Sequence, residues 1–333
     1  MDNQIENIVD KYGRVHDYLR ISLTERCNLR CFYCMPAEGI ELRDKAEFMS
    51  SEELLAIAKV FVELGVKKIR LTGGEPLVKR GFDDLIQELA KLPIEIALTT
   101  NAILIDSHLD ALLKAGIKNI NVSLDSLKEE RFNTISRRSY FHKIKENISL
   151  LLENDFNVKI NVVLMRDVND DEIFDFVEWS RTEKIHIRFI EFMPFDGNNW
   201  NLEKKVSLKE IIDKVNFFYG ADKVMRIEDA KNDTTKNYQI KGSIGSFGVI
   251  SSVTNPFCST CNRIRLTADG KIKNCLFSQS ETDLLTEYRA GNPLKELILD
   301  AIHSKYKERG GFADFSNETV RKMKNRSMIT IGG

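Results

Sequence analysis

The sequence predicts an α/β fold built on a parallel sheet, either open and doubly wound or curved as part of a (β/α) barrel. Short β-branched runs alternate with longer amphipathic segments through the first two-thirds of the 333 residues. Polar motifs follow the predicted strands, which places them together at the carboxyl ends of the sheet. After about residue 197 the pattern changes to antiparallel strands, so we expect a smaller β-rich C-terminal region with a helical tail.

Six β-branched runs predict the strands, at residues 18–24, 67–72, 94–100, 118–125, 157–164 and 184–192. Helical patterns lie between them. After the first strand, Ser50 and Glu53 form a capping box, apolar residues recur at helical spacing, and Gly65 ends the segment. Because helices separate successive strands, the crossovers predict parallel pairing.

The region from residue 198 reads differently. Segments 237–253 and 263–277 are typical of antiparallel strands, and Asp269-Gly270 predicts a two-residue hairpin turn. Pairing Ala268 with Lys271 across that turn puts Cys275 opposite Ile264. We therefore divide the chain into residues 1–197 and 198–333, with the helical tail starting near residue 293.

Composition excludes several classes of protein. Hydrophobic residues make up 42% and charged residues 30%, and the formal net charge is -1. This balance argues against a nucleic-acid binder that relies on bulk positive charge. The longest apolar runs are too short for a membrane span, and the start of the sequence lacks the pattern of a signal peptide. We therefore expect a cytoplasmic protein whose six cysteines stay reduced and serve metal binding or catalysis.

The first cysteine set, Cys27, Cys31 and Cys34, has the spacing C-x3-C-x2-C in a loop after the first strand. Buried structural cysteines would instead recur at core periodicity. A structural zinc site normally has four ligands, and no nearby Cys or His completes this one. A thiol redox pair would leave Cys27 unexplained. A 4Fe-4S cluster with three thiolates and one open iron accounts for the count.

These residues resemble the signature of the radical S-adenosylmethionine (SAM) superfamily, in which an aromatic residue, here Tyr33, precedes the third cysteine. The segment "GGEP", 73–76, strengthens the resemblance. The resemblance implies a radical SAM partial (β/α)6 TIM-type barrel in which SAM chelates the open iron. One-electron cleavage of SAM then gives methionine and a 5′-deoxyadenosyl radical.

The second set, Cys258, Cys261 and Cys275, has the spacing C-x2-C-x13-C. A zinc ribbon with His303 as fourth ligand, or a mixed site that borrows from the first set, remains open on spacing alone. The equal count of three in both sets favours two clusters, each with an open iron.

The combination resembles the GTP 3′,8-cyclases, the molybdenum-cofactor biosynthesis protein A family, over nearly the whole chain. Matching segments include "LRISLTERCNLRCFYCMP", "KKIRLTGGEPL", "INVSLD", "IRFIEFMP", "NPFCSTCNRIRLTADGKIKNCLF" and the final "GG". The resemblance implies that the second cluster receives the guanine base of GTP, that the radical removes H3′, and that C3′ then attacks C8. Departures are Ala102, where the family usually has glycine, and a short loop after Pro36.

The resemblance also implies the binding residues and the partners. SAM should contact Tyr33, Gly74, Ser123 and Met193, and GTP should contact Arg20, Arg70, Thr99, Lys159, Arg263, Arg265 and the main chain near Ile264. Arginines suit a triphosphate because their fixed fork matches phosphate oxygens. The tail residues Gly332 and Gly333 should reach the active site. Implied partners are a second copy in a homodimer, a low-potential electron donor and a downstream cyclic pyranopterin monophosphate synthase, with no nucleic acid and no membrane.

Two alternative functions remain at this stage. Another radical SAM enzyme with an auxiliary cluster, such as a peptide-modifying maturase, shares both cysteine sets. A zinc-stabilised nucleotide-binding module without catalytic activity would share the fold. The arginines that flank the second set favour the cyclase over a peptide-modifying enzyme, because a peptide substrate does not need a polycationic site.

Overall fold

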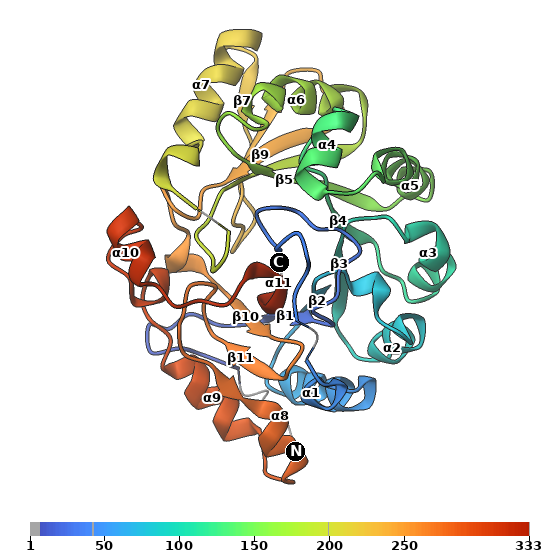
Figure 1. Cartoon of the computed structure of the whole chain (residues 1–333), viewed down its shortest axis with the longest axis vertical. Coiled ribbons are helices and arrows are strands. Elements are labelled where there is room, and N and C mark those ends of the chain that lie inside the picture. Colours follow the sequence, from blue (N-terminus) through green and yellow to red (C-terminus); the bar gives the residue numbers. More distant parts are fainter. Residues whose placement is uncertain (1–6, 42, 199, 333) are drawn as a thin grey trace.

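The computed structural model describes residues 7–41, 43–198 and 200–332. In these residues one curved sheet of 12 strands has helices along its outer face (Figure 1). The strands are β1 Tyr18–Ser22, β2 Lys68–Thr72, β3 Glu95–Thr100, β4 Asn119–Ser123, β5 Asn157–Leu164, β6 Ile185–Glu191, β7 Val224–Arg226, β8 Lys236–Ile240, β9 Ser246–Ile250, β10 Arg263–Leu266, β11 Lys271–Lys273 and β12 Thr282–Asp283. The helices are α1 Ser51–Glu63, α2 Phe82–Leu89, α3 Ile105–Lys114, α4 Glu129–Ser136, α5 Phe141–Glu153, α6 Ile173–Thr182, α7 Leu208–Tyr219, α8 Leu284–Arg289, α9 Lys295–His303, α10 Asn317–Lys322 and α11 Met328–Ile331.

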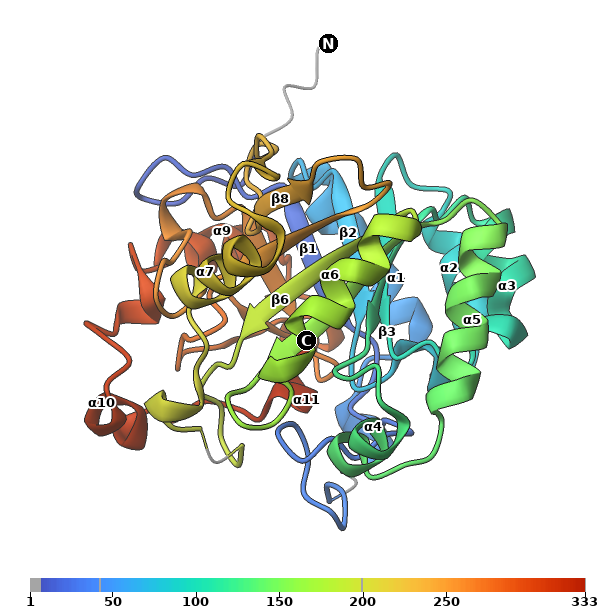
Figure 2. The same cartoon turned by 90° about the horizontal axis from the view of Figure 1, so that it is seen from above.

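The six predicted strands are confirmed as β1 to β6. Each pairs in parallel with the next in sequence order, and Figures 1 and 2 show helices packed outside them. The capping box before α1 is also confirmed, since the Ser50 side chain accepts from the main-chain N–H of Glu53 and the Glu53 carboxylate accepts from that of Ser50. Gly65 follows α1 with a φ of +88°, the left-handed conformation expected after a helix end.

Side-chain alternation separates the core from the lumen of the curved sheet. On β1, Leu19 and Ile21 are fully buried beneath the helices, whereas Arg20 between them lines a central pocket. On β2, Ile69 and Leu71 are likewise core residues and Arg70 lines the same pocket. The period of two along each strand thus directs cations into the interior of the sheet.

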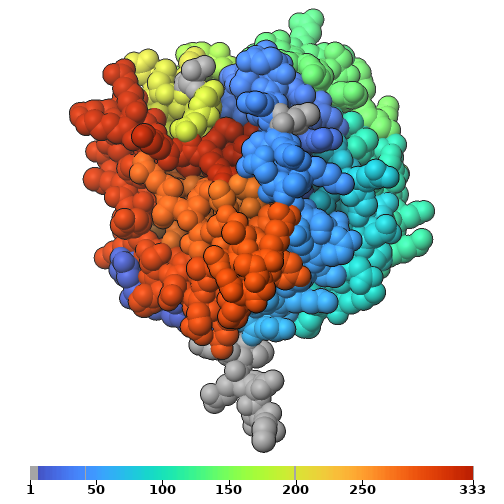
Figure 3. Space-filling model, turned by 60° about the horizontal axis from the view of Figure 1, so that its bottom comes forward, coloured from blue at the N-terminus to red at the C-terminus, as the bar shows by residue number. Residues whose placement is uncertain are grey.

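The C-terminal strands extend the same sheet at both edges. Strand β10 pairs in parallel with β1, and β9 pairs in parallel with β6. Antiparallel strands follow outward, β11 and β12 on one side and β8 and β7 on the other. In the described residues the sheet therefore ends at β12 and β7, and Figure 3 shows the C-terminal segments packed beside those near the N-terminus.

The hairpin between β10 and β11 forms where expected, but the two-residue turn was wrong. Leu266 pairs with Ile272, which shifts the predicted register by one residue. Thr267 N–H donates to the Lys271 carbonyl at 3.0 Å, and Gly270 has a φ of +70°. The loop therefore has three residues and ends in a left-handed glycine, the second most common hairpin geometry.

The helical tail begins earlier than residue 293, with α8, and ends in α11 near the middle of the curved sheet (Figure 1). Met328 and Ile329 of α11 contribute to the central pocket. None of the helices in the described residues has the length and apolar content needed to span a bilayer.

Candidate functional site

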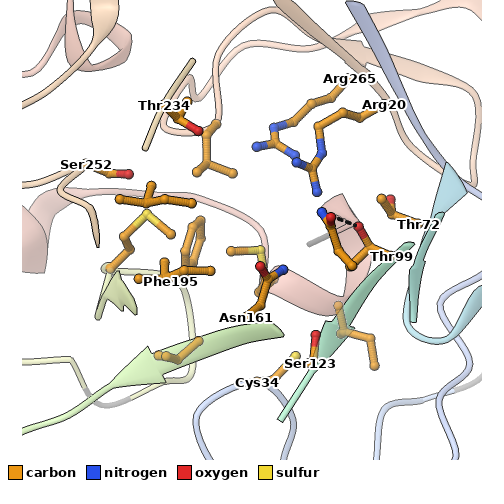
Figure 4. Close-up of a pocket in the computed structure, with 18 of the residues that line it drawn as sticks. Arg20, Cys34, Thr72, Thr99, Ser123, Asn161, Phe195, Thr234, Ser252 and Arg265 are labelled. Atoms are coloured by element: carbon orange, nitrogen blue, oxygen red, sulfur yellow. Dashed lines mark hydrogen bonds between the residues drawn. The ribbon is translucent and has the colours of Figure 1, made fainter. Parts of the chain in front are cut away.

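A pocket of about 340 Å³ occupies the lumen of the sheet, and all six cysteines line it. The first set lies in the loop after β1, and the second set lies around the β10–β11 hairpin. Figure 4 shows Cys34 and Ser123 on one side of the pocket, with Arg20 and Arg265 pointing inward on the other. The fold therefore brings both cysteine sets to one pocket. The first set follows β1, as the sequence predicted, whereas Cys258 and Cys261 precede β10 and Cys275 follows β11.

The thiols of the first set are half-buried and near enough to act on one another electrostatically. Burial raises the pKa of Cys34 to about 12 and that of Cys27 to about 11. The pKa of Cys31 is also raised, first by burial and then by Asp125 and the neighbouring thiols. Three free thiols that repel one another when ionised need a cation to hold them as thiolates, so this donor set fits an iron–sulfur cluster.

The "GGEP" segment fixes the loop that carries the first set. Gly74 N–H donates to the Thr24 carbonyl at 2.7 Å, and Glu75 N–H donates to the Arg26 carbonyl at 2.8 Å. A Cβ on Gly74 would lie 2.4 Å from the Arg26 carbonyl oxygen. Glycine is therefore required here because the cysteine loop passes too close for a side chain.

The Glu75 carboxylate joins this segment to the end of β3. It accepts hydrogen bonds from Thr100 Oγ1 at 2.7 Å and from the main-chain N–H of Asn101 at 2.7 Å and of Leu77 at 3.0 Å. Burial outweighs these hydrogen bonds and raises the pKa of Glu75 to about 7. The carboxylate thus serves as a structural acceptor beneath the cysteine loop.

The four residues predicted to contact SAM all line the pocket: Tyr33, Gly74, Ser123 and Met193. Tyr33 donates its hydroxyl to Asp125 Oδ2 at 2.6 Å, and the Asp125 Oδ1 atom accepts from Val163 N–H at 2.8 Å. The loop at Met193 is held by the Asn198 amide, which donates to its carbonyl at 2.8 Å. The structure brings these residues to one pocket with the first cysteine set. Their contact with SAM stays a prediction.

The second set has cationic neighbours. Lys305 Nζ lies 3.5 Å from Cys261 Sγ, and the main-chain N–H of Arg309 lies 3.5 Å from Cys258 Sγ. Burial opposes ionisation of Cys261, but Lys305 and Arg263 together lower its pKa. This positive surrounding favours the thiolate form of Cys261, whereas burial raises the pKa of Cys258.

A single-ion zinc site is not supported by the geometry. Across residues 7–41, 43–198 and 200–332, no three His, Cys, Asp or Glu side chains converge to hold one metal ion. His303, the suggested fourth zinc ligand, is exposed and is not among the residues that line the pocket. A cluster in which each thiolate binds a different iron does not require such convergence, so it fits these wider sets.

An array of five arginines lies in the pocket between the cysteine sets. Its members are Arg20, Arg70, Arg188, Arg263 and Arg265, from β1, β2, β6 and β10. Burial and mutual repulsion lower the pKa of Arg188 to about 9 and that of Arg265 to about 10. The same field acts on Tyr18: burial alone would raise its pKa, but Arg70, Arg20 and Arg263 bring it down to about 7.

Parts of this array lack protein acceptors. Among the described residues, Arg188 Nε and Nη2 and Arg263 Nη1 are buried without a hydrogen-bond partner. Arg70 differs, since its Nε donates to the Tyr18 hydroxyl at 2.6 Å and its Nη1 to the Leu98 carbonyl at 2.8 Å. Buried guanidinium groups without acceptors are costly, so the array is suited to an oxyanion ligand with several negative charges.

The predicted GTP residues fall into two groups. Arg20, Arg70, Thr99, Arg263 and Arg265 line the pocket, whereas Lys159 and the fully buried side chain of Ile264 do not. Lys159 lies on the same face of β5 as Asn161 but earlier on the strand, and burial and Arg188 lower its pKa.

Arg188 was missed by the sequence reasoning. The signal was available, because Arg188 alternates with Ile187 and Phe189 on β6 as Arg20 alternates with Leu19 and Ile21 on β1. Since the flanking residues are fully buried, the arginine between them must face the lumen.

The C-terminal tail lies beside the pocket, where Met328 and Ile329 contribute to its lining and Gly332 lies next to it. Gly332 has a φ of +84°, and a Cβ on it would lie 2.5 Å from Thr72 Oγ1 and 2.9 Å from Ser22 Cβ. Its carbonyl accepts a hydrogen bond from Arg265 Nη1. Gly333 lies outside the described residues.

Ala102, where the resemblance predicts glycine, has a φ of +65° and is fully buried. The left-handed backbone typical of a glycine is therefore kept, at a cost of roughly 1 kcal/mol for a residue with a Cβ. Its main-chain N–H donates to Thr100 Oγ1 at 2.9 Å, and its carbonyl accepts from the Asn147 amide at 2.7 Å.

Comparison with known families divides the chain in two. Residues 21–180 match the radical SAM superfamily, and residues 185–310 match the family described as Molybdenum Cofactor Synthesis C. The first match contains the first cysteine set, and the second contains all three cysteines of the other set.

Several relatives match over nearly the whole chain. The mitochondrial GTP 3′,8-cyclase of Arabidopsis thaliana is 44% identical over 100% of this chain and 85% of its own length. The GTP 3′,8-cyclase of Peptoclostridium acidaminophilum is 42% identical over 100% of both. Molybdenum cofactor biosynthesis protein 1 of Homo sapiens is 44% identical over 97% of this chain, which spans 51% of that longer protein.

Solved structures support the fold. Streptococcus suis SuiB bound to its precursor peptide SuiA has a TM-score of 0.63, at 16% identity, over 92% of this chain and 70% of SuiB. The SAM-bound form of SuiB gives a TM-score of 0.60 at 18% identity, over 89% of this chain and 70% of SuiB. At this identity the likeness shows the fold alone, whereas the full-length relatives show that the chain belongs to the GTP 3′,8-cyclase family of radical SAM proteins.

Proposed function

We propose that this protein is a GTP 3′,8-cyclase, which converts GTP to (8S)-3′,8-cyclo-7,8-dihydroguanosine 5′-triphosphate in molybdenum cofactor biosynthesis. The observation that carries the proposal is the buried arginine array between two cysteine sets in one pocket. A triphosphate supplies the oxyanions that the unpartnered nitrogens of Arg188 and Arg263 require. We class the reaction as that of a lyase.

Cys27, Cys31 and Cys34 would hold one 4Fe-4S cluster, and Cys258, Cys261 and Cys275 would hold the other. When bound at the first set, SAM and the cluster supply a 5′-deoxyadenosyl radical by one-electron cleavage. Tyr33, Gly74, Ser123 and Met193 would orient SAM. The main chain at Gly74 packs closely against the main chain of the cysteine loop at Arg26. This contact keeps the loop beside the end of β2 and so limits where SAM can lie.

The arginines would position GTP rather than take part in bond making. Arg20, Arg265 and Arg188 project from three different strands, so they can contact different phosphate oxygens at once. Thr99 lines the pocket and would contact GTP directly. Lys159 and the main chain near Ile264 lie outside that lining and would contribute from farther away. Fixing the triphosphate at one end directs the ribose and guanine toward the cysteine sets, which is positioning of the kind that accelerates an intramolecular reaction.

A peptide-modifying function is less well supported. Burying five arginines near one another costs free energy that a peptide substrate would not recover. The 44% identity to a GTP 3′,8-cyclase over the full chain also supports the nucleotide reaction.

The remaining features of the proposal concern the setting of the enzyme. We propose a cytoplasmic homodimer that takes electrons from a low-potential donor and passes its product to cyclic pyranopterin monophosphate synthase. We also propose that residues 1–197 supply the radical and residues 198–333 supply the second cluster and much of the substrate site. The second cysteine set, Arg263 and Arg265 all lie in the latter part.

The test is anaerobic incubation of the iron-loaded protein with SAM, a strong reductant and GTP deuterated at C3′. We expect a cyclised nucleotide that separates from GTP by chromatography, together with 5′-deoxyadenosine that carries deuterium. Cys34→Ser should form neither product. If the wild-type protein cleaves SAM but leaves GTP unchanged and yields undeuterated 5′-deoxyadenosine, the proposed substrate is wrong.

A further inference from the structure

Lys305 is a buried cation whose ammonium group faces the second cysteine set. Lys305 is only 2% exposed. A buried lysine normally needs a partner, because its charge is costly to remove from water. The ammonium has two acceptors in the described residues: Cys261 Sγ at 3.5 Å and the Arg263 carbonyl oxygen at 3.1 Å. Both acceptors belong to the segment that leads from the cysteines into β10, so a Cys261 thiolate would be the counter-charge of Lys305.

The segment that carries Lys305 is held in place by Arg14 near the N-terminus. Arg14 Nη1 donates to the carbonyls of Lys307 at 2.8 Å and Cys258 at 2.6 Å, and its Nη2 donates to that of Tyr306 at 3.0 Å. Asp10 Oδ2 lies 2.6 Å from Arg14 Nε and fixes the guanidinium. One side chain therefore joins the lysine segment to the cysteine segment, which maintains the distance between Lys305 and Cys261.

The first cysteine set has no comparable cationic donor in the contacts of the described residues. Cys27 Sγ accepts from the main-chain N–H of Leu29 at 3.4 Å and lies 4.0 Å from the neutral Asn101 amide. After burial, nearby carboxylates also raise the pKa values of this set. Glu75 acts on Cys27, and Asp125 acts on Cys31 and Cys34. Arg30 also acts on Cys27, but its guanidinium donates to the Cys27 main-chain carbonyl and not to sulfur. In the described contacts the second set therefore differs from the first by having a cation that donates directly to a thiol sulfur.

We propose that Lys305 is a positioning residue of the second site, where its N–H···S hydrogen bond and its charge raise the reduction potential of the cluster held by Cys261. This inference rests on the proposed function, because it requires an iron–sulfur cluster at the second set. Hydrogen bonds to cluster sulfurs and local net charge both affect cluster potentials. A fixed positive charge stabilises the reduced cluster, which carries one more negative charge, so the potential rises.

The experiment uses the full-length chain with Cys27, Cys31 and Cys34 replaced by serine, so that one cluster gives the signal. After anaerobic reconstitution, its midpoint potential is measured by a redox titration followed by electron paramagnetic resonance. Lys305→Met removes both charge and donor, Lys305→Gln keeps a neutral N–H donor, and Lys305→Arg keeps both. Lys307→Met is the matched control, because Lys307 lies on the same segment but is exposed. Iron and sulfide per chain and the melting temperature are measured for each variant.

We expect Lys305→Met to move the midpoint to a more negative potential with iron and sulfide retained. Lys305→Gln should lie between it and the parent, Lys305→Arg should be nearest the parent, and Lys307→Met should be unchanged. An unchanged midpoint in a fully loaded Lys305→Met protein would overturn the inference. So would loss of iron from Lys305→Met at an unchanged melting temperature, since Lys305 would then be needed for assembly. Failure of the parent chain itself to hold iron and sulfide would instead refute the proposed second cluster.

Discussion

Arg265 Nη1 donates a hydrogen bond to the carbonyl oxygen of Gly332 at 3.1 Å, which ties the C-terminal tail to the arginine array. Arg265 lines the pocket, and α11 just before Gly332 contributes Met328 and Ile329 to it. The tail therefore positions one of the cations proposed to bind the triphosphate.

Replacing Gly332 with alanine should reduce cyclisation by about 10- to 100-fold, because a small displacement of reacting groups has an effect of this size. The added Cβ would lie 2.5 Å from Thr72 Oγ1, so the tail must move. Cleavage of SAM and iron content should be retained, as measured by 5′-deoxyadenosine formation and metal analysis.

Gly291→Ala is the control for Gly332→Ala. Gly291 also has a positive φ, +77°, but a Cβ added there would have no atom within 4 Å. It should lose a little stability through backbone strain and keep its cyclisation rate. Equal activity of both alanine variants would show that the tail does not position Arg265.

Replacing Arg188 with methionine should weaken GTP binding by about 10- to 100-fold, the equivalent of roughly 1.5–3 kcal/mol for charge-assisted hydrogen bonds. The melting temperature of the GTP-free protein should stay equal or rise, because the lowered pKa of Arg188 means that the folded state disfavours its charge. Isothermal titration with GTP and thermal unfolding measure the two effects.

Arg181→Met is the control for Arg188→Met, since Arg181 is exposed and pairs with Glu178 at 2.9 Å on α6. Its GTP affinity should be unchanged. A destabilised Arg188→Met protein with normal GTP affinity would give Arg188 a structural role and remove it from the substrate site.

Local pattern predicted the strands of the parallel sheet, but it did not fix the register of the hairpin or the extent of the pocket along each strand. On β5, Lys159 lies on the face that carries Asn161 and Val163, and both of these line the pocket. The alternation of side chains does not show how far the pocket extends along the strand. The pocket lining includes Asn161 but does not reach Lys159. The hairpin shows the same limit, since Asp269-Gly270 is compatible with two loop lengths and only the left-handed Gly270 together with the Thr267 pairing selects three residues.

Contacts between distant segments could not be predicted at all. Arg14 joins Cys258 to the segment after α9 across more than 240 positions of sequence, and no local pattern marks such a contact. The parallel pairing of β10 with β1 is similar, because the sequence indicated the β10–β11 hairpin but not the strand beside which it would lie. Family resemblance supplied the residues of the site, whereas the structure supplied their neighbours.

Acid should destabilise the protein through His16, which is fully buried and lies 3.1 Å from Asp10. Burial is the main cause that lowers its pKa to about 4. Between roughly pH 6.5 and 4 the unfolded chain binds this proton and the folded chain does not, so stability falls as pH decreases through that window. The expected loss at pH 5 is about 2 kcal/mol relative to pH 7.

Urea unfolding of the metal-free protein at pH 7 and pH 5 measures this effect. His16→Gln keeps an N–H donor for Asp10 without a titrating ring, so its stability should change less between the two pH values. His142→Gln, at an exposed position, should behave as the wild type. If His16→Gln and the wild type lose equal stability, another group carries the acid sensitivity.

Replacing Gly74 with alanine should prevent the first cysteine set from holding its cluster. The added Cβ would lie 2.4 Å from the Arg26 carbonyl oxygen and 2.9 Å from that of Glu25. These are main-chain atoms directly before Cys27 and cannot rotate away, so the loop must shift and its three thiols with it. We expect iron and sulfide per chain to fall by about half in Gly74→Ala, because the second set is unaffected.

Gly81→Ala separates this clash from general strain at a glycine. Gly81 has a φ of +74° with nothing within 4 Å of a Cβ, so alanine there adds backbone strain without a steric conflict. It should keep full iron content and SAM cleavage with a modest loss of stability. At Gly74, by contrast, the backbone conformation is one that alanine can adopt, but there is no room for a Cβ. If Gly74→Ala retains all its iron and cleaves SAM at the wild-type rate, the close approach of the "GGEP" segment to the cysteine loop does not position the cluster.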